Sequence, residues 1–199
     1  MSGLTRQEIE QTNLELFQRH SNFRVAADWI AAELSRLPEV SRVVLFGSVA
    51  VPLKKEVPRF REYRRAGIEV WHETQDLDLA VWLSDLAQLP ALKKAAAQAL
   101  NRLRRESGTD VQFYLLDVFI LEPGTDRYWG GLCISRDCPK YRAVQCNVPE
   151  CGKPRFLRRF AKFSFDPLFL HPSRSQVLFD RGQAPTPERG PETPLSSEI

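Results

Sequence analysis

The chain has 199 residues, of which 43% are hydrophobic and 27% charged, and its formal net charge is +3. This composition predicts a globular protein with one full core and room for a small second module, and it excludes fibrous and collagen-like classes. No apolar run approaches the ~18 residues of a membrane span, and acidic residues interrupt the first helical pattern at Glu8, Glu10 and Glu15, which is not typical of a secretory leader. We therefore expect a cytoplasmic protein without a membrane partner.

Helices and strands are expected to alternate along the chain. A capping box, Thr5-Arg-Gln-Glu8, predicts the start of a first helix, and Ser21 predicts the cap of a second helix that stops at Pro38. The alanine- and leucine-rich segment from Leu89 to Arg105 predicts a helix that ends before Gly108. Strand-like apolar patterns occur at Val43–Phe46, Ile68–His72, Leu77–Leu83 and Val111–Val118. We expect Ile68–His72 to pair with Leu77–Leu83 through a turn near Thr74. The order predicts an α/β (α+β) fold with a small mixed sheet flanked by helices.

Three regions differ in composition. Residues 1–126 hold the predicted α/β domain, with a basic insertion at about 50–72. Residues 127–170 hold four cysteines, a second basic stretch and five phenylalanines, and are expected to form a module packed on or hinged to the first domain. Residues 182–199 are a proline-rich polar tail that we expect to be disordered. The two basic stretches, Lys54–Arg65 and Lys153–Lys162, indicate either anionic partners or solvated faces.

All four cysteines fall within one short segment, spaced C-x4-C-x7-C-x4-C, at Cys133, Cys138, Cys146 and Cys151. In a reducing compartment a disulfide pair is disfavoured, and four thiolates form a closed tetrahedral site for structural zinc. Free thiols, disulfides and redox chemistry are the alternatives to this zinc site.

Acidic residues open two of the predicted strands. Asp76 and Asp78, at positions i and i+2, project from the same face, and Asp110 is expected to join them from the next strand. Three carboxylates on one face repel one another unless a cation neutralises them, and Mg²⁺ prefers oxygen ligands. Gly47-Ser48, directly after a buried strand, lets backbone amides and a hydroxyl approach the phosphates of a nucleotide.

With these motifs the chain resembles the nucleotidyltransferase superfamily with the polymerase-beta-like fold. The matching residues are Gly47-Ser48, the Asp76-x-Asp78 pair and the later Asp110, within a region from about Ser21 to Leu116. The resemblance implies transfer of a nucleoside monophosphate from a nucleoside triphosphate, with ATP expected, to an acceptor. It also implies that Gly47 and Ser48 hold the triphosphate and that Asp76 and Asp78 carry both Mg²⁺ ions. Asp110 is implied to bind the catalytic Mg²⁺ and to help activate the acceptor hydroxyl. RNA, a protein hydroxyl and a small molecule are the acceptors considered, with the segment Lys153–Phe165 either binding nucleic acid or supplying core phenylalanines.

Two departures from the family pattern support a different hypothesis. The segment Val49–Gln75 separates Ser48 from Asp76 by more than the family spacing, and Pro52 disfavours the helix that usually follows the Gly-Ser turn. The alternative is therefore a catalytically inactive, zinc-stabilised adaptor that binds nucleic acid or protein. An antitoxin-like role with a separate helical partner is a third hypothesis. If the chain is active, Lys54 and Lys55 are candidates for the positive charge near the phosphates, and His72 is expected near the carboxylates without a catalytic role.

Overall fold

A computed structural model describes residues 5–58, 61–136, 138, 146, 151–159 and 164–183 of the protein. Its helices and strands are α1 (Arg6–Leu34), β1 (Val40–Phe46), β2 (Lys55–Glu56), α2 (Arg61–Arg65), β3 (Val70–Trp71), β4 (Leu77–Leu83), α3 (Leu89–Ser107), β5 (Leu116–Leu121), β6 (Tyr128–Leu132), β7 (Leu157–Arg158) and β8 (Ser175–Asp180). In the described part of the chain, every helix is too short or too polar to cross a membrane.

The centre of the fold is a six-stranded mixed sheet in the order β7-β6-β5-β4-β1-β8. Only β4 and β5 are parallel, because α3 carries the chain from one to the other; the remaining neighbours are antiparallel. The predicted mixed sheet in an α+β fold is therefore confirmed. Strands β1 and β4 lie close to two of the predicted strands, Val43–Phe46 and Leu77–Leu83, whereas β8 was not predicted.

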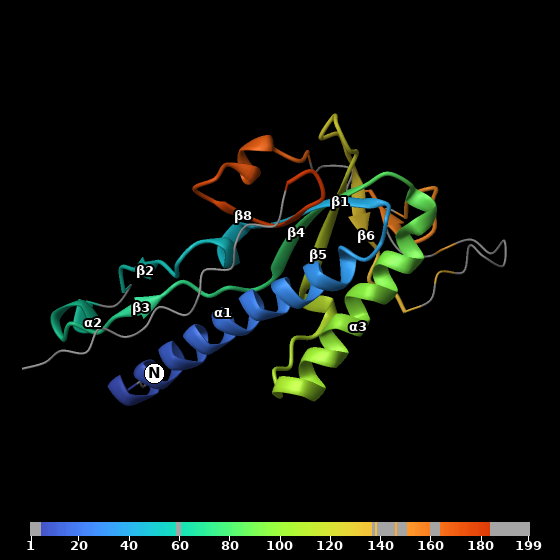
Figure 1. Ribbon diagram of the computed structural model, residues 1–199. Helices are drawn as coiled ribbons and strands as arrows, with labels where there is room; N and C mark the ends of the chain where they lie inside the picture. Colours follow the sequence, from blue (N-terminus) through green and yellow to red (C-terminus); the bar gives the residue numbers. More distant parts are fainter. Residues whose placement is uncertain are drawn as a thin grey trace, which may run out of the picture.

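The two faces of the sheet are covered differently. Helices α1 and α3 lie side by side on one face (Figure 1), where they enclose the main core with inward residues such as Leu45, Leu79 and Ile120. The opposite face, called the helix-free face below, has no α-helix in the described part of the chain and carries only a short 3-10 helix, Pro167–Leu170. There the segment before β8 places Phe165 and Phe169 against Phe46, with ring centroids 5.7 and 5.9 Å away. The helix-free face is the one that carries the carboxylates described below.

A single helix replaces the two that were predicted near the N-terminus. The capping box is confirmed, since the Glu8 backbone N–H donates to Thr5 Oγ1 and the Thr5 N–H donates to Glu8 Oε2. Ser21, however, lies inside α1, and the helix ends at Leu34, before Pro38. Ser21 does not cap a helix because Phe23, Ala26, Ala27 and Ile30 continue one buried stripe along α1, and packing this stripe favours an unbroken helix.

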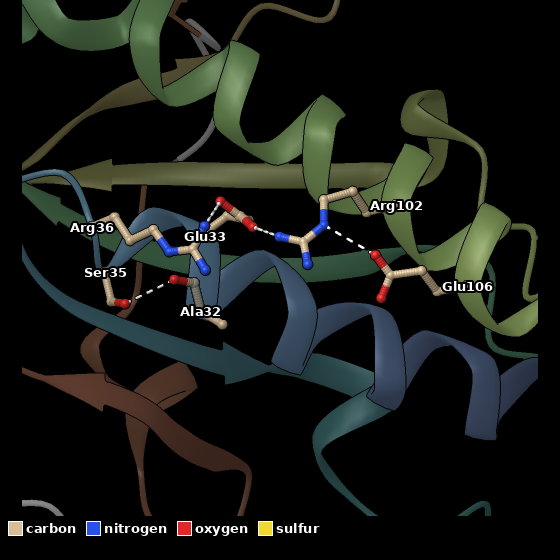
Figure 2. A network of polar contacts seen from close by, with 6 residues as sticks. All are labelled: Ala32, Glu33, Ser35, Arg36, Arg102 and Glu106. Carbon is tan, nitrogen blue, oxygen red and sulfur yellow. Dashed lines mark hydrogen bonds and ion pairs between the residues drawn. The ribbon is translucent and has the colours of Figure 1, made fainter.

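Helices α1 and α3 are joined by a network of charges at their contact (Figure 2). The Glu33 carboxylate lies between two guanidinium groups, those of Arg36 in the turn after α1 and Arg102 on α3. Arg102 also pairs with Glu106, one turn further along α3. The Glu33 side chain is only 13% exposed, so this carboxylate depends on its partners. Gly108 ends α3 with a left-handed φ of 73°, as its position after the predicted helix requires.

The long insertion folds into an arm, residues 51–58 and 61–75, that leaves the sheet and runs beside the N-terminal half of α1 (Figure 1). The predicted pairing of Ile68–His72 with Leu77–Leu83 is wrong. Strand β3 pairs instead with β2 inside the arm, with Lys55 opposite Trp71 and Glu56 opposite Val70. The pairing differs because β4 already has β1 and β5 as its two neighbours.

The cysteine-containing segment contributes its strands to the same sheet. Strand β6 pairs with β5, and β7 pairs with β6, while Cys133, Cys138 and Phe156 are buried in the main core. Phe156 and Phe165 are therefore core residues, as the structural alternative for this stretch expected. Phe160 and Phe163 lie outside the described residues, as does the predicted tail from residue 184 onward.

Candidate active site

The Gly47-Ser48 turn begins where β1 ends. Residues Gly47–Ala50 form a short 3-10 helix, η1, and Val51 returns to extended backbone before Pro52, which cannot continue a helix. Gly47 has a φ of +75°, and a Cβ on it would lie 2.4 Å from Asp78 Oδ2. Glycine is favoured here, because a side chain would strain the backbone at this angle and its Cβ would have to displace the Asp78 carboxylate. The turn expected to approach phosphates is thus in contact with one of the predicted metal-binding carboxylates.

Register across three strands places an aromatic ring and two carboxylates in one row. Phe46 of β1 is the partner of Asp78 in β4, and Asp78 is the partner of Asp117 in β5. Since Leu77 and Leu79 face the main core, the alternation of a strand turns Asp78 to the helix-free face, and Asp76 precedes it by two residues. Asp76, Asp78 and Asp117 together are called the carboxylate row. In addition to burial, the charges of Asp76 and Asp117 raise the pKa of Asp78, and the charge of Asp76 raises the pKa of Asp117.

The neighbour of Asp78 on the next strand is therefore Asp117, and Asp110 does not open that strand as predicted. Asp110 lies in the exposed loop after α3, where its Oδ2 accepts a hydrogen bond from Gln112 Nε2 at 2.7 Å. The strand expected at Val111–Val118 begins only at Leu116, because Phe113–Leu115 form a 3-10 turn that returns the chain to the sheet. The shift moves the start of the strand past Asp110 and puts Asp117 beside Asp78.

The electrostatics of the row are those of crowded negative charge. Burial, then the charges of Asp76 and Asp117, raise the pKa of Asp78 to about 7. Asp117 is more exposed than Asp78, and its pKa is also raised, first by partial burial and then by Asp76, against the opposing charge of Arg158. Such a cluster attracts a cation or a proton.

Arg158 brings positive charge to this row from the far edge of the sheet. It lies opposite Gly131 of β6, and Gly131 lies opposite Phe119, two residues beyond Asp117 on the same face. Two strand spacings, about 10 Å, separate the β7 and β5 backbones, and Gly131 adds no side chain between them. The charge of Arg158 accordingly lowers the pKa of Asp117, although burial and Asp76 raise it overall.

Three other residues that were expected near the site lie on the arm. The Lys55 ammonium pairs with Glu69 and lies 5.3 Å from the Trp71 ring centroid, so its charge is already engaged there. His72 Nδ1 lies 2.7 Å from Glu56 Oε1, also within the arm. The exposed Lys54 precedes β2, and its carbonyl accepts the N–H of His72.

The described side chains bear differently on the two predicted metal ions, Zn²⁺ and Mg²⁺. Within the described ranges, no group of three or more His, Cys, Asp or Glu side chains is gathered in a form that could hold a metal ion. Cys133 and Cys138 are buried, Cys146 and Cys151 are half-buried, and none of these four described cysteines forms a disulfide, so the four-thiolate zinc site stays a prediction. For Mg²⁺ the donor chemistry does fit, because this ion needs only one or two carboxylates together with substrate phosphates, and the row supplies crowded carboxylates beside the Gly47 turn.

Comparison with protein-family models, with curated proteins and with solved structures gives no match.

Proposed function

We propose that this protein is a nucleotidyltransferase that transfers a nucleoside monophosphate from a nucleoside triphosphate, with ATP expected, to a hydroxyl of an acceptor. One observation carries the proposal: the Gly47 turn lies against the carboxylate of Asp78, whose strand neighbour is Asp117. A turn that can hold phosphates and a row of carboxylates that can hold a cation are then in direct contact, as phosphoryl chemistry requires.

The residues divide the task by position. The backbone amides of η1 and the Ser48 hydroxyl hold the triphosphate at the end of β1. Asp76 and Asp78 hold Mg²⁺, which when bound neutralises phosphate charge and polarises the reacting phosphorus. In the transfer, the acceptor oxygen forms a bond to the α-phosphorus, the bond from that phosphorus to the bridging oxygen breaks, and pyrophosphate leaves with the electron pair. Asp117, with its raised pKa, accepts the proton of the acceptor hydroxyl.

Arg158 supplies the cation for the phosphates in this proposal, in place of Lys54 and Lys55. Its charge already acts on Asp117, and a guanidinium binds phosphate oxygens bidentately. Arg158→Gln should therefore weaken binding of a triphosphate more than that of the corresponding monophosphate. Equal weakening of both would contradict this role, and Arg158→Lys should recover part of the triphosphate affinity.

The proposal is tested by binding of the four ribonucleoside triphosphates, with and without Mg²⁺, and by release of pyrophosphate. Asp78→Asn should abolish the Mg²⁺-dependent part of the affinity. Asp117→Asn should leave binding largely intact and lower turnover by about 10²- to 10⁴-fold, the usual contribution of a positioned general base. Asp110→Asn is the matched control and should behave like the unmodified protein.

Each alternative outcome has a definite meaning. Loss of turnover in Asp110→Asn, with Asp117→Asn unaffected, would restore Asp110 as the third carboxylate. Absence of any Mg²⁺-dependent triphosphate binding by the folded protein would refute the transferase and favour the inactive adaptor.

A further inference from the structure

A cavity of about 630 Å³ lies between the N-terminal half of α1 and the arm, away from the main core. Figure 1 shows the two elements running side by side beyond the end of the sheet. The volume falls within the range of small-molecule sites, about 300–1,000 Å³. The apolar part of the wall includes Leu16 of α1 and, from the arm, Tyr63, Val70 and Trp71.

Specific contacts hold the two walls together. Asn13 Nδ2 donates to the Glu69 carbonyl at 2.7 Å, and the Phe17 and Trp71 rings meet edge to face with centroids 4.9 Å apart. At the inner end, Arg19 pairs with Glu73 at 2.9 Å. The cavity is thus formed by a defined docking of the arm on α1.

The charges around the cavity select against phosphates. Its lining holds three carboxylates, Glu15, Glu56 and Glu73, and one guanidinium, that of Arg19. Glu73 pairs with Arg19 and Glu56 with His72. Glu15 accepts a hydrogen bond from the neutral Gln11 amide and, among the described residues, has no ion pair. A ligand ammonium can therefore pair with Glu15 while its body packs on the Tyr63 and Trp71 rings.

A short stretch of chain connects the inner end of this cavity with the carboxylate row. Arg19, a lining residue, donates through Nη2 to the Gln75 carbonyl at 3.1 Å, and Gln75 directly precedes Asp76. Glu73 precedes Asp76 by three positions in the chain, which span about 10 Å of extended backbone at most. A molecule that fills the cavity can therefore direct one end toward the reacting centre.

We propose that this cavity binds a small molecule with a flat apolar body and a protonated amine, and that this molecule is the acceptor. The second half of the statement rests on the proposed function, whereas the first does not. The transfer step is the one given above, with the hydroxyl of this molecule as the attacking group.

Binding is tested with three probes that share one apolar body and differ in charge: 2-(2-naphthyl)ethylamine, 2-(2-naphthyl)ethanol and 2-naphthylacetate. Isothermal titration of the full chain at pH 7 should give the tightest binding for the amine and the weakest for the carboxylate. Glu15→Gln should lower the affinity of the amine about two- to fivefold, the value of one exposed ion pair, and leave the alcohol unchanged. Trp71→Leu should weaken all three by about tenfold or more.

Glu10→Gln is the matched control, since Glu10 lies on the same helix, is exposed and pairs with Arg6 outside the cavity lining. It should change none of the affinities. Glu15 is also exposed, so its variant tests the idea even if Trp71→Leu disturbs the arm. Equal or tighter binding of the carboxylate, an unchanged preference for the amine in Glu15→Gln, or no binding by the folded protein would overturn the proposed site.

The acceptor role is tested by adding ATP with Mg²⁺ to the amine-bound protein. Both should bind together, because the cavity and the triphosphate turn are separate places. Displacement of the amine by ATP would show that the cavity belongs to the nucleotide site and would overturn the acceptor role. If ATP does not bind at all, the proposed function fails while the probe series still decides whether the cavity holds an amine.

Discussion

Replacing Asp78 by asparagine tests the crowded carboxylate row through the pH dependence of stability. Asp78 has a pKa of about 7 in the folded chain, against an ordinary value of 3.8. Between these two pH values the folded protein keeps a proton that the unfolded chain has lost. The free energy of unfolding must therefore fall as the pH rises through this window, since the folded state binds more protons.

The size of this effect follows from the two pKa values. A tenfold change in proton affinity corresponds to about 1.4 kcal/mol, so the difference between 3.8 and about 7 amounts to about 4 kcal/mol as an upper value. Asparagine carries no charge at any of these pH values. Asp78→Asn should thus match the unmodified protein near pH 4 and exceed it in stability by up to about 4 kcal/mol at pH 8.

Urea unfolding from pH 4 to pH 8.5 measures this difference, and Asp110→Asn serves as the control. Asp110 is exposed, so its variant should follow the profile of the unmodified protein. At pH 8, Mg²⁺ should stabilise the unmodified protein but have little effect on Asp78→Asn, because a cation that binds only the folded state adds stability. Parallel profiles for Asp78→Asn and the unmodified protein would refute the crowding of charge at this row.

Two further predictions concern single positions. Gly47→Ala should lower the free energy of unfolding by about 1–2 kcal/mol because of the left-handed backbone, and it should also weaken Mg²⁺-dependent triphosphate binding. Gly124→Ala is the control: its φ is +79°, but no described atom lies within 4 Å of its Cβ, so it should show only the loss of stability. Equal triphosphate affinities of the two variants would contradict the contact with Asp78. Glu33→Ala should lower the free energy of unfolding by about 1–3 kcal/mol, because it leaves two guanidinium groups without their shared carboxylate. Glu106→Ala, which removes a side chain that is 53% exposed, should lower it by less than about 1 kcal/mol in the same urea titration.

The helices and central strands could be predicted from local patterns. Thr5 and Glu8 form their capping box, Leu77–Leu83 forms β4 with the expected alternation of faces, and Gly108 ends α3 in the left-handed conformation. These features depend on residues a few positions apart, and the physics that determines them is local. Ser21 shows the limit of such patterns, since a residue suited to a helix cap lies inside a helix when its neighbours form one continuous buried stripe.

The candidate site was predictable only where it lies on one stretch of chain. Gly47-Ser48 and the Asp76-x-Asp78 pair were identified from spacing within single elements. Asp117 was missed, although it lies in the apolar run Leu115–Leu121 as an isolated charge. Such a charge becomes informative only once the strand boundary is known, and the 3-10 turn at Phe113–Leu115 moved that boundary.

The sequence by itself determined the candidates for a phosphate-binding turn and an acidic pair. Both motifs consist of residues one or two positions apart, and the chemistry of glycine, serine and aspartate is enough to identify them. Only the tertiary structure decided which residues join them. The parallel pairing of β4 with β5 selects Asp117 over Asp110, and the pairing of β7 with β6 brings in Arg158 from 41 residues further along the chain. Strand pairing and the docking of the arm on α1 depend on contacts between distant segments, and the residues of one segment alone do not fix such contacts.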